Sequence, residues 1–172
     1  IMTGESIKLR ALEPTDIDIL FLWENDTDVW KVSNTVMPFS KYVLEQYIAE
    51  ADKDIYATRQ LRLMIDANEN KKTIGCIDIF DFDPKNKRAG VGILIDKEHR
   101  NKGYAKEALQ MLIDYAFTVL DLHQLYCNIC EDNKASMNLF QKKGFEIIGL
   151  KKEWIRNGVK YEDEYMLQLV RK

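Results

Sequence analysis

The sequence has 172 residues, of which 46% are hydrophobic, and a formal net charge of −3 at pH 7. This size and composition predict a single domain over residues 1–172, and the small acidic charge argues against a nucleic-acid partner, which needs a basic face. No apolar run approaches a membrane span, and no signal-peptide pattern stands at the N-terminus. We therefore expect a cytoplasmic protein with no membrane partner.

The first half of the chain predicts a strand, two helices and a hairpin. Alternating apolar residues give a first strand over 6–12. Pro14 then opens one helix, and Ser40 caps a second. The stretch 25–38 between them is predicted to be irregular. Two further alternating runs, separated by a polar turn, predict a hairpin over 61–80.

The second half predicts strands separated by helices. A fourth strand over 89–95 is followed by a glycine-containing loop and a long amphipathic helix. A fifth strand over 125–130 and a short helix over 133–144 follow. A sixth strand then begins over 145–150, Asn157 and Gly158 turn the chain, and a last strand over 165–170 closes it. This order predicts an α/β (α+β) fold, in which a single mixed sheet of about seven strands is flanked by about four helices.

The cysteines form no disulfide framework. Cys127 and Cys130 make a C-x-x-C pattern, but they fall in a predicted strand, where residues three apart point to opposite faces. No second cysteine pair and no histidine cluster accompanies them. The pattern favours buried, reduced cysteines over a zinc or redox site, and no metal site is predicted.

The loop H-R-N-K-G-Y-A over 99–105, before the long helix, predicts an anion site. A helix N-terminus exposes unpaired N–H groups and the positive end of the helix dipole. Gly103 lets the backbone approach an anion, and Arg100 and Lys102 add positive charge. The loop fits neither a Walker A motif nor a dinucleotide fingerprint. It predicts a phosphate or pyrophosphate cradle, with an ordinary surface turn as the alternative.

Two motifs resemble those of the GNAT superfamily of acetyl-CoA-dependent N-acyltransferases. Arg100, Gly103 and Ala105 form R-x-x-G-x-A, which resembles the pyrophosphate loop of that family, and residues 133–145 resemble its N-x-x-[AS]-x-x-x-[YF]-x-K-x-G-F segment. The order of elements is similar over nearly the whole chain. The resemblance implies the GNAT fold, with a mostly antiparallel sheet whose fourth and fifth strands splay apart, and acetyl-CoA as cofactor. The cofactor-binding residues that it implies are Ile93, Leu94, Ile95, Arg100, Asn101, Lys102, Gly103, Tyr104, Ala105, Asn133, Ser136, Phe140 and Lys143.

The runs over 115–126 and 154–161 resemble spermidine N-acetyltransferases in particular, in a branch that also holds ribosomal-protein N-terminal acetyltransferases. This implies a small-molecule amine as acceptor, with a polyamine favoured, and a homodimer or larger homo-oligomer. Residues 30–39 contain no acid, whereas the polyamine enzymes carry acids between their two early helices. Acetylation of a protein N-terminus and a non-catalytic acyl-CoA-binding module stay open as alternatives.

Two side chains that many GNAT enzymes use in catalysis are absent from this sequence. The fourth-strand glutamate of many relatives matches Gly90, and their general-acid tyrosine matches Phe140. A main-chain N–H on the fourth strand serves the oxyanion in GNAT enzymes, which implies Leu94 within 93–95. For the base we favour Asp78, since a carboxylate among apolar neighbours can accept a proton. A solvated residue on an open strand face is the alternative for Asp78.

Aromatic and acidic residues are the candidates for the acceptor site. Aromatic rings contact the methylenes of an amine and attract its charge. The predicted substrate-binding residues are Trp23, Glu24, Trp30 and Asp78. Core packing is the simpler explanation for either tryptophan, and solvation explains either acid at least as well. Since no activated nucleophile is evident, direct transfer through a ternary complex is expected.

Overall fold

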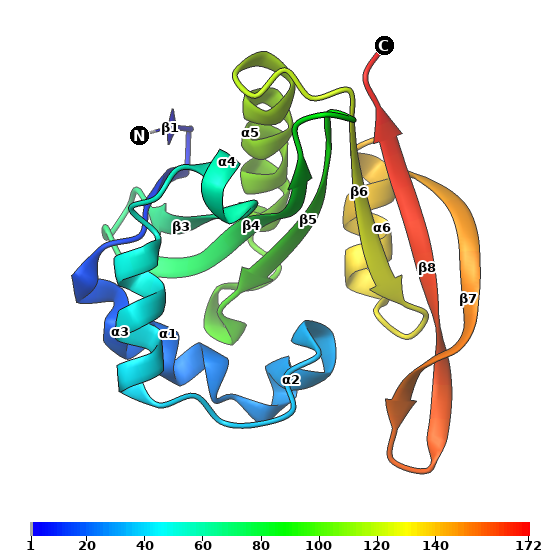
Figure 1. The fold of residues 1–172 in the computed structure, drawn as a ribbon, viewed down its shortest axis with the longest axis horizontal. Coiled ribbons are helices and arrows are strands. Elements are labelled where there is room, and N and C mark those ends of the chain that lie inside the picture. Colours follow the sequence, from blue (N-terminus) through cyan, green and yellow to red (C-terminus); the bar gives the residue numbers. More distant parts are fainter. Residues whose placement is uncertain (1) are drawn as a thin grey trace.

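The computed structural model describes residues 2–172, apart from the side chains of residues 31 and 32, and places them in one mixed sheet with helices on both faces (Figure 1). The strands are β1 (Met2–Thr3), β2 (Ile7–Ala11), β3 (Leu61–Ala67), β4 (Thr73–Asp83), β5 (Arg88–Ile95), β6 (Gln124–Cys130), β7 (Glu146–Asn157) and β8 (Lys160–Val170). The α-helices are α1 (Ile17–Glu24), α2 (Thr27–Ser33), α3 (Lys41–Glu50), α4 (Ile55–Thr58), α5 (Tyr104–Thr118) and α6 (Lys134–Lys142). Two 3-10 turns are η1 (Pro14–Asp16) and η2 (Lys97–His99). Within these residues no helix is long and apolar enough to cross a membrane.

The sheet order is β1-β2-β3-β4-β5-β6-β8-β7, and in the described part of the chain β5–β6 is the only parallel pair. The predicted hairpin is confirmed as β3–β4, whose strands pair antiparallel. The extra strand is the two-residue β1. The predicted turn at Asn157 and Gly158 is confirmed, since β7 ends at Asn157 and β8 follows from Lys160. The strand predicted over 165–170 begins earlier, at Lys160.

The prediction that residues 25–38 are irregular is wrong, because α2 lies within them. The Asp26 side chain caps this helix by accepting a hydrogen bond from an N–H of its first turn, and Asn34 ends it in a left-handed conformation. The indole N–H of Trp30 donates to the main-chain oxygen of Glu24 at 2.7 Å. Capping and this tertiary bond hold the short helix, and neither produces an apolar stripe in the sequence.

Two hydrophobic cores lie on opposite faces of the sheet. The larger contains α5 side chains such as Leu109 and Leu112 and the α6 residue Phe140. The smaller contains side chains of α1 and α3 packed on Met64 and Cys76. Since side chains alternate along a strand, Asp78 and Phe80 of β4 lie on the same face as Cys76, toward α1 and α3.

The start of α1 is anchored by ion pairs. Arg10 of β2 donates to both carboxylate oxygens of Asp16, at 2.8 and 2.9 Å, and to Asp66 of β3 at 2.7 Å. Burial alone would raise the pKa of the Asp16 carboxyl, but hydrogen bonds from Arg10 and from the N–H of Glu13 lower it below its usual value. This cluster fixes α1, and therefore Glu24 at its end, relative to the sheet.

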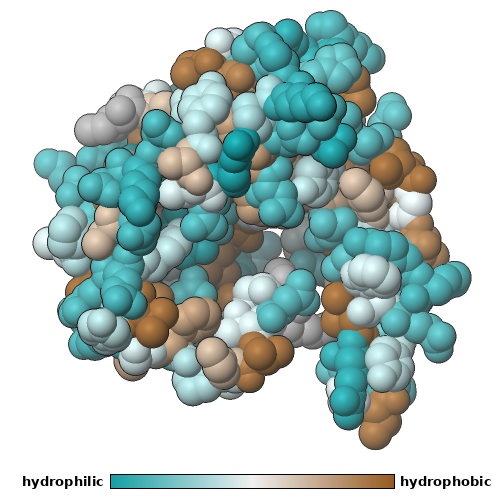
Figure 2. Space-filling model, viewed as in Figure 1, coloured by the Kyte–Doolittle hydropathy of each residue, from teal (hydrophilic) through white to brown (hydrophobic). Residues whose placement is uncertain are grey.

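The parallel strands β5 and β6 separate soon after they meet. They pair only over Arg88–Gly90 and Gln124–Tyr126, whereas β5 stays paired with β4 as far as Ile95. The opening between the two strands is visible in Figure 1, and the surface is hollowed there, above α2 in the view of Figure 2. The predicted splay of the fourth and fifth strands is confirmed as this β5–β6 opening.

Candidate active site

The loop between β5 and α5 has the geometry of an anion cradle. Gly103, the N-cap of α5, has a φ of +82°, and a Cβ added there would meet nothing within 4 Å. Asn101 is also left-handed, with a φ of 63°. Among the described residues no side chain caps the start of α5, so the N–H groups of its first turn are available to a ligand. The side chain of Lys102 between these two residues is exposed.

The loop is tied to the end of β5. The Nε of Arg100 donates to the main-chain oxygen of Ile95 at 3.0 Å. Tyr104 and Ala105 form the first turn of α5 and pack partly buried against the larger core. The open space at Gly103, the uncapped amides and two cationic side chains fit the diphosphate of coenzyme A.

Main-chain groups of β5 point alternately to its two neighbours. The oxygen of Lys87 accepts a hydrogen bond from the N–H of His123, on the β6 side. The N–H of Asp96 donates to the oxygen of Ile74, on the β4 side. In an antiparallel ladder the N–H and C=O of one residue point the same way, and those of the next residue point the opposite way. Odd-numbered residues of β5 therefore turn their main-chain groups toward β6.

This alternation corrects one catalytic prediction. Leu94 is paired with Cys76 and turns its N–H toward β4, so that group is not available in the opening. The neighbouring amide of Ile93 does face the opening. Within the segment 93–95 predicted from the resemblance, Ile93 rather than Leu94 therefore has its amide directed into the opening, and its role in catalysis stays a prediction.

The second motif secures α6. The Asn133 side chain accepts a hydrogen bond from the N–H of Ser136 at 3.2 Å and caps the helix. Lys143, directly after α6, donates to Gln110 of α5 at 3.1 Å. The cap fixes the start of α6 and the Lys143 bond ties its end to α5. Contact of Asn133, Ser136 and Lys143 with the cofactor stays a prediction.

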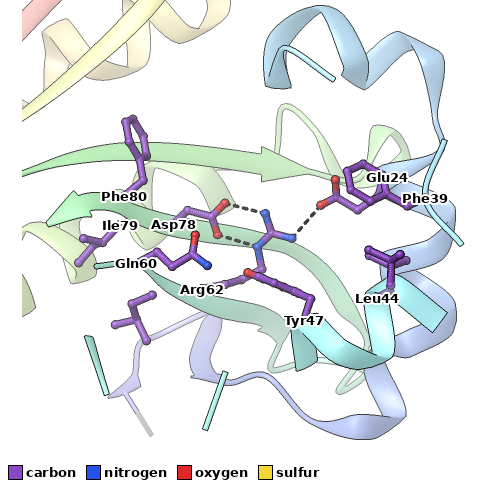
Figure 3. Close-up of a pocket in the computed structure, with 11 residues that line it drawn as sticks. Glu24, Phe39, Leu44, Tyr47, Gln60, Arg62, Asp78, Ile79 and Phe80 are labelled. Atoms are coloured by element: carbon purple, nitrogen blue, oxygen red, sulfur yellow. Dashed lines mark hydrogen bonds and ion pairs between the residues drawn. The ribbon is translucent and has the colours of Figure 1, made fainter. Parts of the chain in front are cut away.

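A pocket of about 300 Å³ lies on the sheet face that carries α1 and α3 (Figure 3). Arg62 of β3 lies between two acids there. Its Nε and Nη2 donate to the two oxygens of Asp78 at 2.8 Å each, and its Nη1 donates to Glu24 at 2.9 Å. Arg62 also lies over the ring of Tyr47, 5.6 Å from its centre. The lining residues are Glu24, Phe39, Val43, Leu44, Tyr47, Gln60, Leu61, Arg62, Asp78, Ile79 and Phe80.

The β3–β4 register brings Arg62 and Asp78 together, because the two residues are direct cross-strand partners. Their side chains are 17% and 29% exposed, so both remain accessible from the pocket. Burial alone would lower the pKa of the Arg62 guanidinium, but the charge of Asp78 and other acidic neighbours raises it well above its usual value. Burial raises the pKa of Tyr47 to about 12. Arg62 therefore stays charged and Tyr47 stays protonated at neutral pH.

Of the predicted acceptor residues, Glu24 and Asp78 meet in this pocket, although 54 positions separate them in sequence. Trp23 does not line the pocket, because it points into the smaller core and is only 6% exposed. Trp30 does not line it either and instead ties α2 to the end of α1. The expectation of purely apolar neighbours for Asp78 is also corrected, since its carboxylate is paired with Arg62.

Sequence reasoning missed Arg62, Tyr47 and Phe80. The available signal for Arg62 was the predicted hairpin, because counting its register places an arginine opposite Asp78. Tyr47 sits on the apolar stripe of its helix, which the sequence pattern assigned to the core. Phe80 gave no signal, since its role depends on contacts with two strands beyond the hairpin.

The glycine at the position of the usual glutamate has a structural cause. A Cβ on Gly90 would lie 2.2 Å from the Phe80 ring, and that ring also contacts Tyr126 of β6 edge-on, 6.0 Å between centres. Phe80 thus occupies the place of a side chain at position 90. Gly92, the cross-strand partner of Asp78, has open space instead, because its nearest contact would be Phe80 at 3.9 Å.

Phe140 stands where many relatives are expected to carry a general-acid tyrosine. Its side chain is 3% exposed and packs edge-on against Phe145, with 5.0 Å between ring centres. It therefore serves the larger core. Its contact with the cofactor stays a prediction.

The cysteines are free, and Cys127 and Cys130 face opposite sides of the sheet as predicted. Burial raises the pKa of Cys127 to about 12. Burial, together with a hydrogen bond to Glu162, raises that of Cys130 to about 12. Because the thiolate is the nucleophilic form, neither group is suited to form an acyl-enzyme.

Comparison with known proteins agrees with this geometry. Residues 6–146 match the family described as "Acetyltransferase (GNAT) domain". An uncharacterized N-acetyltransferase p20 of Bacillus licheniformis is 30% identical over 169 residues, covering 98% of this chain and 94% of the relative. A spermidine N(1)-acetyltransferase of Escherichia coli (strain K12) is 28% identical over 157 residues, covering 91% and 82%. A solved spermidine N-acetyltransferase of Vibrio cholerae, in complex with CoA and spermine, has a TM-score of 0.88 at 23% identity, covering 97% of this chain and 96% of that one.

These findings confirm the predicted family resemblance, including its spermidine N-acetyltransferase branch, and the predicted fold. They also confirm acetyltransferase activity and acetyl-CoA, the acyl donor of the family, as cofactor. The chain belongs to the GNAT family of acetyltransferases.

Proposed function

We propose that this protein transfers the acetyl group of acetyl-CoA directly to a primary amine, and that polyamines are its favoured acceptors. The observation that carries the proposal is the meeting of Glu24 and Asp78 in one pocket. Carboxylates recognise ammonium groups by charge and hydrogen bonding. The relatives named as spermidine N-acetyltransferases support the choice of polyamines.

The donor side rests on main-chain groups. The first-turn amides of α5 at Gly103, with Arg100 and Lys102, would hold the diphosphate. Ile93 and Ile95 turn main-chain groups toward the β5–β6 opening and would hold the pantetheine arm there. Bound acetyl-CoA supplies an activated thioester carbonyl. The Ile93 N–H would donate a hydrogen bond to that carbonyl oxygen.

The acceptor must lose a proton, because an alkyl ammonium has a reference pKa of about 10.4. We assign the acceptance of this proton to Asp78. Each oxygen of its carboxylate accepts one hydrogen bond from Arg62 and retains a further lone pair. Gly92, opposite Asp78, leaves open space beside the β5 main chain. An amine held by Asp78 would reach the opening through that space.

The apolar part of the pocket suits the hydrocarbon of an amine. Phe39, Val43, Leu44 and Phe80 line it beside the charged cluster. Methylene groups between the ammonium groups of a polyamine would contact these side chains. A homo-oligomer and a cytoplasmic location stay predictions.

A panel of acceptors tests the proposal. Polyamines, simple monoamines, aminoglycosides and peptides with free N-termini are each incubated with acetyl-CoA. Release of the CoA thiol is measured, and mass spectrometry locates the added acetyl group. We expect turnover with polyamines and acetylation of a primary amino group. Turnover with peptides alone would replace the proposal by N-terminal acetylation. Binding of acetyl-CoA without turnover of any acceptor would contradict the proposal and favour a non-catalytic acyl-CoA-binding module.

A further inference from the structure

The charges that line the pocket are unequal in number. Glu24 and Asp78 are its acids, and Arg62 is the only cation among the described lining residues. One cation against two anions leaves the pocket with a net charge of −1. The remaining polar lining groups, such as Gln60 and Tyr47, are uncharged at neutral pH.

The hydrogen bonds decide which kind of ligand this cluster can accept. One N–H of each of the three Arg62 nitrogens is bonded to a carboxylate, so the single positive charge of the pocket already faces two acids and the net charge disfavours an anionic ligand. The carboxylates each retain lone pairs, and the side chains of Glu24 and Asp78 are 21% and 29% exposed. The cluster is therefore arranged to receive a hydrogen-bond donor that carries positive charge.

We propose that Arg62 determines acceptor specificity by limiting the pocket to one ammonium group. The inference rests on the proposed function and defines its substrate class more narrowly. One ammonium neutralises the residual charge of the pocket. A second ammonium in the same apolar space would have no unpaired counter-charge, and burial of an unpaired charge is costly. The fitting acceptor is an alkylamine whose next charge lies beyond an apolar spacer, outside the pocket.

A purely structural role for Arg62 makes a different prediction. Arg62 joins α1, β3 and β4 through its contacts with Glu24 and Asp78, so its loss would loosen the site for every acceptor alike. Activity and stability would then fall, but the preference between two acceptors of different charge would stay the same. The ratio of kcat/KM for a diamine to that for a monoamine of equal length separates the two roles.

The experiment varies the pocket charge in steps while Asp78 stays intact. Arg62→Met makes the net charge −2, Glu24→Gln makes it zero, and the double variant returns it to −1. For each folded protein, kcat/KM is measured with propylamine and with 1,3-diaminopropane by release of CoA. We expect the diamine-to-monoamine ratio to rise about tenfold in Arg62→Met and to fall about tenfold in Glu24→Gln. In the double variant it should return to within about threefold of wild type.

Two further variants keep the test decisive. Arg62→Lys retains the charge, so its ratio should stay within about threefold of wild type even where both rates fall. Arg156→Met, on the exposed β7 strand, is the control and should leave the ratio unchanged. If Arg62→Met does not fold, Glu24→Gln and Arg62→Lys still give different expectations, because the ratio should fall in the first and stay near wild type in the second.

The outcomes separate this inference from the proposed function. Turnover by wild type with ratios that stay constant across the charge series, or that move the same way in Arg62→Met and Glu24→Gln, overturns the role of Arg62 alone. If wild type acetylates no amine, the proposed function fails and the inference fails with it. Thermal melting of each variant confirms that the compared proteins are folded.

Discussion

The donor and acceptor sides of this site are built from different kinds of groups. The donor side consists largely of main chain, namely the loop at Gly103 and the edge of β5 at Ile93. The acceptor side consists of side chains from three elements, with Glu24 from α1, Arg62 from β3 and Asp78 from β4. Main-chain groups keep their positions when side chains change, whereas a cluster of side chains changes with each substitution. The difference explains how one fold can retain a common cofactor while its acceptor varies.

The largest expected effect is on the donor side. Gly103→Val should weaken acetyl-CoA binding by at least about a hundredfold, because a branched side chain would fill the cradle and the φ of +82° disfavours it. The added strain is about 1–2 kcal/mol, and no neighbour lies within 4 Å of the new Cβ, so the protein should still fold. Isothermal titration calorimetry measures the affinity.

Gly149→Val is the matched control, since a Cβ at Gly149 also has open space, and the residue lies in β7 rather than in the loop. It should bind acetyl-CoA as wild type does. Wild-type affinity in Gly103→Val would mean that the main chain of this loop does not hold the diphosphate.

The second effect is on the acceptor side. Asp78→Asn should lower kcat by about a hundredfold, the usual contribution of a general base, while acetyl-CoA affinity stays within about twofold. Steady-state kinetics and calorimetry measure the two quantities separately. Asp81→Asn, an exposed neighbour on the same strand, serves as the control. An unchanged rate in Asp78→Asn would remove Asp78 as the proton acceptor and leave the donor side unaffected.

The difference between the main-chain donor side and the side-chain acceptor side also explains which parts of the site the sequence could predict. Gly103 and Asn133 stand in local motifs, and the splay follows from the resemblance, so the donor side was accessible without a structure. Leu94 was assigned in place of Ile93 because the direction of a main-chain amide depends on strand pairing, and the pairing is set by residues on β4 and β6.

The acceptor side could be predicted only in part. Glu24 and Asp78 were named separately. The register of the predicted hairpin places Arg62 opposite Asp78, but it does not bring Glu24 of α1 to the same arginine. Trp23 and Trp30 were assigned by residue type, and their actual orientation depends on which face of the helix meets the sheet. The short α2 was missed because a cap and one indole hydrogen bond stabilise it.

The third effect concerns the place where the two sides meet. Gly90→Ala should lower the free energy of unfolding by about 1–3 kcal/mol, because its Cβ would lie 2.2 Å from the Phe80 ring. Urea denaturation measures the change. The double variant Gly90→Ala/Phe80→Leu should be less destabilised than the sum of its single changes, because the smaller side chain relieves the overlap. Strictly additive losses would show that Phe80 is not the reason for glycine at this position.

The smallest effect is predicted two residues along the same strand, where Gly92 faces open space. Gly92→Ala should leave stability and acetyl-CoA affinity near wild type, because the nearest atom to its Cβ would be 3.9 Å away. The new methyl group narrows the space beside Asp78, its cross-strand partner, and should raise the KM for the amine about five- to tenfold. Steady-state kinetics measures this KM, with Gly149→Ala as the control. A loss of stability as large as that of Gly90→Ala, or an unchanged KM, would contradict the passage of the acceptor between Asp78 and the β5 main chain.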